Sequence, residues 1–252
     1  MWIGSDHRHR HGATIAELLV VIGLIGVLFS IAFPALMRAK SAAGQTKSLA
    51  NAQSAALAID AYRNDHDDTY PYVHKGVPYR VSRDAEGSIA NSSNEARWET
   101  RQLWWAVIAD TIELNEYWES WLSPGLDPDK ARVPSYYFSN SFVAASRLWT
   151  PGFDGDLSVL RPVRGAEVAF PSNKAMVWDS MLAYVHRSLV PRDGMSRFPI
   201  PIAFADLHAE PRKLIDAAEP VTNVLNSNAW ADSKLHNTPN GVLGGDYGVQ
   251  NR

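Results

Sequence analysis

The sequence predicts an α+β fold in which one long N-terminal helix packs on a small antiparallel β-sheet. Two observations carry this prediction. An apolar run near the N-terminus passes into an alanine-rich, amphipathic segment, and short β-rich runs bounded by proline, glycine or asparagine occupy the C-terminal half. At 252 residues, the chain is long enough to bury a core.

The apolar run extends from Leu18 to Phe33 with Ser30 as its only polar side chain, and its apolar character continues to Met37. About 20 residues at about 1.5 Å each are enough to cross the hydrocarbon core of a bilayer. The sequence therefore predicts one transmembrane helix. The short polar tail before it, with Arg8 and Arg10, favours a cytoplasmic N-terminus.

A secretory signal peptide is the alternative for this segment, with a small-x-small cleavage site such as Ser30-Ile31-Ala32. Glu17 argues against it. A carboxylate at the mouth of a membrane helix is costly without a partner, so an acidic residue there indicates a function.

The helix is expected to continue beyond the membrane and to end near Asn64, because polar, turn-forming residues and then Pro71 follow. Apolar residues on one face of this continuation recur at helical spacing: Leu49, Ala52, Ala56 and Ile59. The adjacent residues His66, Asp67 and Asp68 are interpreted as a solvated loop rather than a metal site, because neighbours in sequence converge on an ion only through an unusual turn.

The start of the apolar run carries a family resemblance. The stretch Gly12-Ala13-Thr14-Ile15-Ala16-Glu17, followed by LLVVIGLIGVL, resembles the cleavage and methylation motif of type IV prepilins and type II secretion pseudopilins. The resemblance implies peptidase cleavage after Gly12, N-methylation at Ala13, and an assembly role for Glu17, the fifth mature residue. It also implies a helix kink at Pro34. The family's usual first mature residue is phenylalanine or methionine, whereas this chain has Ala13.

On this resemblance the chain divides into a leader at 1–12, a transmembrane and assembly helix at 13–37, an amphipathic continuation at 38–64, and a globular pilin-like domain at 65–252. The implied protein is a non-enzymatic structural subunit of a type II secretion or type IV pilus-like filament. It would cross the inner membrane once, with a cytoplasmic N-terminus and a periplasmic globular domain. Its expected partners are a prepilin peptidase, other pilin or pseudopilin subunits, the inner-membrane assembly platform and membrane lipid.

The central part of the chain is rich in tryptophan. Residues Lys75 to Glu95 read as a loop, and one or two helices are expected between Trp98 and Leu122. A core role is favoured over a carbohydrate-stacking or partner surface, because aliphatic residues share the spacing of the tryptophans. The tryptophans concerned are Trp98, Trp104, Trp105, Trp118 and Trp121.

Three strands are expected at Ser135–Phe142, Lys174–Asp179 and Ile200–Asp206. The segments SYYFSN, PSNKAMVWD and AFADLHAE are similar to the C-terminal pattern of a large pseudopilin-like group with a phenylalanine-x-aspartate-x-histidine element. This chain has Leu207 where that group usually has glycine. The final segment, GVLGGDYGVQNR, is expected to be an irregular tail.

Asp206, His208 and Glu210 alternate along the expected third strand and would share one face there, where Asp179 or His186 could complete a metal site. Turn hydrogen bonds are the favoured alternative role for Asp206 and His208. The sequence has no Gly-rich phosphate loop, HExxH or Gly-x-Ser-x-Gly motif, and no cofactor is expected. A second cluster, His7, His9 and His11, would be removed by cleavage after Gly12.

Composition limits the remaining functions. A formal net charge of -3 offers no basic field for nucleic acid, and the absence of cysteine excludes disulfides and thiolate sites. Two classes stay open: a structural filament subunit, and a membrane-tethered domain that recognises polysaccharide, substrate or metal through its tryptophans or the Asp206/His208 end.

Overall fold

The computed structural model describes residues 14–74, 76–79, 96–109, 111–112, 117–186, 190, 194–226 and 233–248. The proposed leader with Gly12 and Ala13, its three histidines, and most of the Lys75–Glu95 segment lie outside these described residues. The chain forms two compact units, Met1–Lys40 and Ser41–Arg252.

Helix α1 extends from Ile15 to Asp65 and contains Pro34. Its end agrees with the expectation drawn from the polar segment before Pro71. In the first unit its apolar side chains are exposed, and none of its most apolar stretch is buried. By length and composition this part of α1 is able to cross a membrane.

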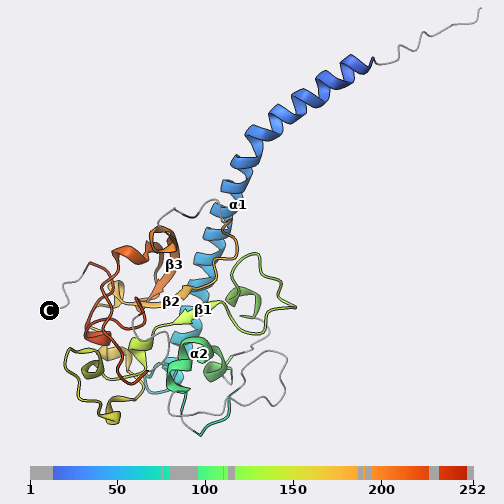
Figure 1. The fold of residues 1–252 in the computed structure, drawn as a ribbon. Coiled ribbons are helices and arrows are strands. Elements are labelled where there is room, and N and C mark those ends of the chain that lie inside the picture. The colour runs from blue at the N-terminus through green and yellow to red at the C-terminus, as the bar shows by residue number, and fades with distance from the viewer. Residues whose placement is uncertain are drawn as a thin grey trace, which may run out of the picture. The chain divides into compact units, whose positions relative to one another are not determined.

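In the second unit, α1 packs on a four-stranded antiparallel sheet of order β1-β2-β3-β4 (Figure 1). The predicted α+β pilin-like fold is confirmed. The strands are β1 (Tyr136–Phe138), β2 (Ala175–Asp179), β3 (Pro199–Phe204) and β4 (Ala209–Lys213). The first three fall inside the predicted runs or within one residue of them, whereas β4 was not predicted.

The α1 face against the sheet is made of small residues. Ala52, Ala55 and Ala56 are fully buried there with Ile59, so the helix backbone approaches the strands closely. Leu49, expected on the same stripe, is only half-buried.

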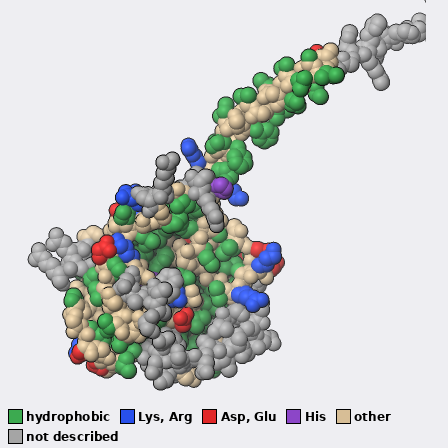
Figure 2. Space-filling view, viewed as in Figure 1, with side chains coloured by type: hydrophobic (Ala, Val, Ile, Leu, Met, Phe, Trp, Pro, Cys, Tyr) green, Lys and Arg blue, Asp and Glu red, His purple; other side chains and the backbone are tan. Residues whose placement is uncertain are grey.

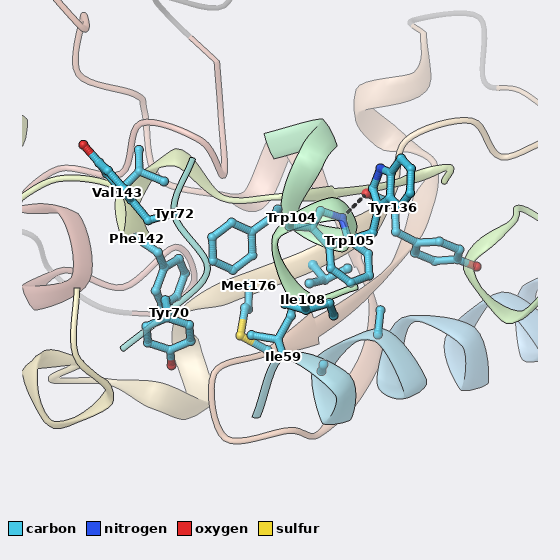
Figure 3. Packing of buried hydrophobic residues seen from close by; sticks show 14 of the residues in the cluster. Ile59, Tyr70, Tyr72, Trp104, Trp105, Ile108, Tyr136, Phe142, Val143 and Met176 are labelled. Atoms are coloured by element: carbon cyan, nitrogen blue, oxygen red, sulfur yellow. Dashed lines mark hydrogen bonds between the residues drawn. The ribbon is translucent and has the colours of Figure 1, made fainter. Parts of the chain in front are cut away.

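The five tryptophans lie in the core, as predicted, and Figure 3 shows two of them, Trp104 and Trp105. Each is at most 1% exposed. Trp104 and Trp105 lie on α2 (Thr100–Ile108), and the Nε1 atom of Trp104 donates to the Tyr136 carbonyl on β1 at 2.9 Å. These rings are therefore not accessible for stacking on a carbohydrate.

The C-terminal segment is irregular but is not a loose tail. Val242, Asp246 and Tyr247 are buried, and Asp246 Oδ2 lies 3.0 Å from the Nζ atom of the fully buried Lys174. Tyr247 packs in a core cluster with Ile202 and Phe204 of β3, whereas Val242 belongs to the cluster that contains the buried α1 residues.

Candidate functional site

The N-terminal end of α1 is closed by a reciprocal pair of hydrogen bonds. The backbone N–H of Thr14 donates to Glu17 Oε2 at 2.7 Å, and the backbone N–H of Glu17 donates to Thr14 Oγ1 at 3.2 Å. This is a capping box, in which two side chains satisfy backbone donors that the helix leaves open. The Thr-x-x-Glu spacing could have been read from the sequence, and it was missed.

The capping box gives Glu17 a partner within its own helix. Glu17 is the only acidic residue between Thr14 and Ile59. The positive end of the helix dipole also favours a carboxylate in the first turn. Each carboxylate oxygen accepts more than one hydrogen bond, so Glu17 keeps capacity for a further partner.

The rest of the apolar span carries no unsatisfied side-chain donor. The Ser30 hydroxyl donates to the Val27 carbonyl at 2.7 Å, one turn back along α1. Such a bond lets a hydroxyl stay in hydrocarbon without an external partner.

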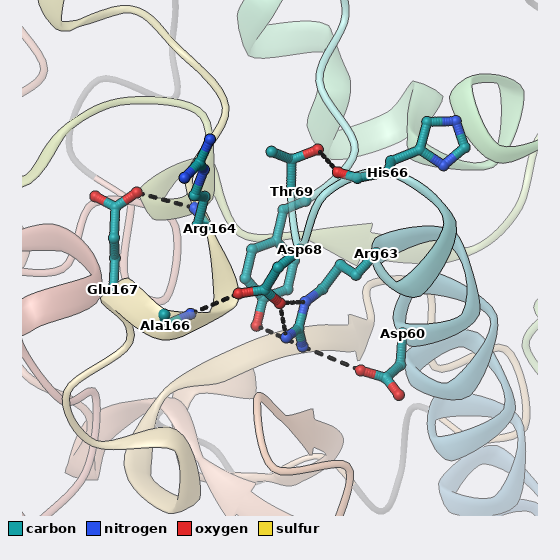
Figure 4. Close-up of polar contacts among 9 residues, drawn as sticks. Asp60, Arg63, His66, Asp68, Thr69, Arg164, Ala166 and Glu167 are labelled. Carbon is teal, nitrogen blue, oxygen red and sulfur yellow. Dashed lines mark hydrogen bonds and ion pairs between the residues drawn. The ribbon is translucent and has the colours of Figure 1, made fainter.

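The polar segment after α1 is held against a distant loop (Figure 4). Asp68 accepts from Arg63 Nε at 3.2 Å and from the Ala166 backbone N–H at 2.9 Å. Desolvation opposes the charged form, but these bonds outweigh it and lower the pKa of Asp68. A Cβ at Gly165 would overlap both the Arg63 and Asp68 side chains. Asp68 is thus a structural anchor for this loop, although its side chain remains 42% exposed to solvent.

Asp206 and His208 lie in the turn between β3 and β4. The expectation that they continue a regular strand with Glu210 is wrong, because β3 ends at Phe204 and the chain reverses there. Leu207 forms the turn with φ +73°, the left-handed conformation for which glycine is the usual residue.

The side chains of the turn engage one another. His208 Nδ1 lies 2.5 Å from Asp206 Oδ1, and His208 Nε2 lies 3.5 Å from Glu210 Oε1. The His208 ring also stacks on Phe204, at 4.5 Å between centroids. This arrangement favours a turn role, and no group of three metal-ligating side chains occurs among the described residues.

Asp179, considered as a further ligand, is instead a buried connection between sheet and helix. Its Oδ2 accepts from the hydroxyls of Ser48 and Ser123, each at 2.7 Å, and its Oδ1 accepts from the backbone N–H groups of Met181 and Leu182. Burial raises its pKa despite these bonds. His186 is exposed.

An exposed apolar helix, a polar cap at its N-terminal end and a globular unit packed around its second half define a pilin-like protein. The particular relatives are components of one secretion machine. The chain is 35% identical over 79 residues to the type II secretion system core protein G of Pectobacterium carotovorum subsp. carotovorum, covering 31% of this chain and 49% of that protein. It is 33% identical over 76 residues to that of Aeromonas hydrophila, covering 30% and 52%.

The corresponding protein of Escherichia coli K12 is 31% identical over 86 residues, which is 34% of this chain and 59% of that protein. The chain spans about half the length of the curated relatives it matches. No protein-family pattern and no solved structure match it. The chain is therefore pilin-like and related to the type II secretion pseudopilins, which confirms the resemblance drawn from its N-terminal motif.

Proposed function

We propose that this chain is a structural subunit of a type II secretion filament, and not an enzyme. One observation carries the proposal: a capped helix terminus with a single carboxylate, Glu17, leads directly into an exposed apolar span. An apolar helix surface long enough to cross a membrane is stable only when lipid or other apolar helices surround it. The names of the relatives favour a secretion filament over a pilus.

The membrane arrangement belongs to the same proposal. Residues 13–37 anchor the chain in the inner membrane, with the N-terminus in the cytoplasm and residues 65–252 in the periplasm. The proposed maturation is cleavage after Gly12 by a prepilin peptidase, followed by methylation of Ala13. The inner-membrane assembly platform and membrane lipid are its other proposed partners, and a kink at Pro34 stays a prediction.

The second candidate function, recognition of polysaccharide or metal, depended on residues that the structure shows to be buried or engaged by their neighbours. The tryptophans are buried in the core. His208 is engaged by its neighbours Asp206 and Glu210. No observation favours this alternative.

Expression with and without a prepilin peptidase tests maturation. Mass spectrometry is expected to find the mature terminus at Ala13 only when the peptidase is present. A Gly12→Leu variant, with a bulky residue at the cleavage site, should remain precursor while Ala16→Leu, a matched change outside it, should be processed. A mature terminus after Ala32 would instead establish a signal peptide.

Crosslinking tests assembly. The chain has no cysteine, so a single cysteine placed at Leu24 in the apolar span reports only contacts between subunits. With an added mild oxidant, disulfide-linked dimers are expected in cells that carry the secretion system, and mixed dimers are expected with related subunits given a cysteine at the facing position. A chain that is processed and inserted but never crosslinks at any position along the span would refute the role of filament subunit.

A further inference from the structure

One end of the globular unit presents apolar and cationic side chains together. This proximal end consists of α1 residues Ser41–Ser48 and the three segments Met181–Tyr184, Met195–Pro199 and Lys213–Ile215. Contacts with α1 locate two of these segments directly. The Tyr184 side chain packs where a Cβ on Gly44 would lie, and Gln45 Nε2 donates to the Pro199 carbonyl at 3.2 Å.

The third segment, Lys213–Ile215, is connected to the other two through the β-sheet, and all three line a common cleft. Lys213 pairs with Pro199 across the β3–β4 ladder. A cleft of about 320 Å³ is lined by residues of all three segments, among them Leu182, Met195 and Leu214. The proximal end is thus one continuous surface built from distant parts of the chain.

Several apolar side chains at this surface are exposed to solvent and are not part of the core. Met181 is 59% exposed, Ile215 41% and Met195 38%. On the face of the globular unit seen in Figure 2, hydrophobic side chains lie at the surface among basic and acidic side chains.

The four segments of the proximal end carry only cations, while Lys234, which also lines the cleft, pairs with the exposed Glu219. The four segments contain no acidic residue, and their exposed cations are Lys47, Arg197 and Lys213. Asp216, which follows Ile215 directly, is the nearest exposed acid along these segments. Exposed apolar side chains interspersed with cations suit the interface of a bilayer that contains anionic lipid.

The chain itself limits how far this surface is from the membrane. Only four residue steps separate Met37, at the end of the apolar span, from Ser41. Even fully extended they reach at most about 14 Å, and one further helical turn of about 5 Å leads to Gly44. The headgroup region on each side of the hydrocarbon core is about 5–8 Å thick. Lipid headgroups are therefore within reach of the proximal end.

We propose that the proximal end of the globular unit docks on the bilayer surface, with Met181, Met195 and Ile215 in the interface and Lys47, Arg197 and Lys213 at anionic headgroups. The inference rests on the proposed membrane anchor. Docking would hold the globular unit at the membrane before assembly, so extraction of a subunit would have to release this contact as well as the α1 span.

Site-specific fluorescence quenching in the full chain tests the proposal. A Met181→Cys variant carries the label at the proximal end, and Leu157→Cys is its matched control, since Leu157 is 57% exposed. Leu157 belongs to the segment leading to Val163, whose carbonyl accepts from the Tyr70 backbone N–H beyond the other end of α1. A third label at Leu28→Cys, within the apolar span, reports insertion.

Each variant is reconstituted in phosphatidylcholine vesicles containing phosphatidylglycerol and a lipid with a headgroup or acyl-chain spin label. We expect headgroup quenching at position 181 to exceed that at position 157 by about twofold or more. Equal quenching at 181 and 157, with strong acyl-chain quenching at 28, would overturn docking and leave the anchor intact. Absence of quenching at 28 would refute the anchor itself.

Charge reversal tests the electrostatic part. Arg197→Glu with Lys213→Glu, in the Met181→Cys background, is expected to lower quenching at 181 toward the level at 157. Quenching at 28 should not change. Undiminished quenching at 181 would show that these cations do not hold the surface at the bilayer.

Discussion

The Ser48 hydroxyl on α1 donates to Asp179 Oδ2 at the end of β2 at 2.7 Å, and both residues are buried. The bond joins elements 131 residues apart in the sequence. Ser48 also lies 2.8 Å from the Tyr136 hydroxyl, so one small side chain links the helix to two strands.

Ser48→Ala should therefore destabilise the globular unit. The change removes one of the four hydrogen bonds described for Asp179, and losing such a bond to a buried charged group costs about 1.5–3 kcal/mol. Denaturant unfolding followed by tryptophan fluorescence would measure it. Ser54→Ala is the matched control, because the Ser54 hydroxyl makes only a long 3.5 Å contact with Ser120. Equal midpoints for the two variants would contradict a structural role for the Ser48–Asp179 bond.

Leu207 provides a test of backbone strain in the β3–β4 turn. Its φ of +73° disfavours any residue with a Cβ, and the side chain is partly buried against the core. Leu207→Ala removes the packing and keeps the strain, whereas Leu207→Gly removes both. The glycine variant should be more stable than the alanine variant by about 1 kcal/mol. Thermal unfolding of the pair would measure the difference, and an alanine variant as stable as the glycine variant would mean that this backbone conformation is not strained.

Stability is expected to fall in mild acid because of His236. Burial lowers the pKa of His236 to about 3, and the charges of Arg101 and Lys174 act in the same direction. In the unfolded chain the pKa is about 6.5. Between these values the unfolded state binds the proton more tightly, so the contribution is complete above about pH 6.5 and is lost as the pH falls toward 3. Each unit of difference corresponds to about 1.36 kcal/mol, which makes the loss several kcal/mol.

A comparison with His236→Gln isolates this effect from that of Asp179, whose raised pKa acts in the opposite direction. Unfolding midpoints are measured from neutral pH to about pH 4. The wild-type chain should lose stability more steeply than the variant over this range. Parallel profiles would show that the buried ring does not determine the acid sensitivity.

The sequence predicted the end of α1 and the positions of strands β1 to β3, because neighbouring residues determine these features. The helix ended where polar residues precede Pro71, and β1 to β3 formed where β-branched or aromatic residues cluster. Strand β4 was missed because its sequence, AEPRK, contains a proline and three charged residues. An edge strand tolerates both, since one of its sides needs no partner.

Long-range contacts explain what the sequence did not predict. The C-terminal segment reads as irregular on its own, and it is ordered by Asp246, which pairs with Lys174 and accepts from the Ala175 backbone N–H at 2.9 Å. Asp68 likewise depends on Ala166, 98 residues away. The capping box at Thr14 and Glu17 is different, because its local spacing made it predictable.

The capping box bears on the prediction that Glu17 directs assembly between subunits. A carboxylate at the edge of the bilayer loses hydration, and the Thr14 backbone N–H compensates only part of that loss. In a filament, the free α-amino group proposed at Ala13 of a neighbouring subunit would supply the missing positive charge. Glu17→Leu should leave the chain cleaved, inserted and folded, but should abolish crosslinking between subunits. Glu17→Asp should be intermediate, because the shorter side chain keeps the charge and reaches less far.

Glu17→Gln separates capping from charge, since an amide oxygen can still accept the Thr14 N–H while carrying no charge. If a charge pair directs assembly, the glutamine variant should crosslink through a cysteine at Leu24 as poorly as the leucine variant. Thr14→Val, which keeps the Glu17 carboxylate and removes the hydroxyl that caps the Glu17 N–H, should crosslink close to the wild-type level. Full crosslinking of Glu17→Gln together with its loss in Thr14→Val would show that Glu17 acts by shaping the helix terminus and not by meeting a neighbour's charge.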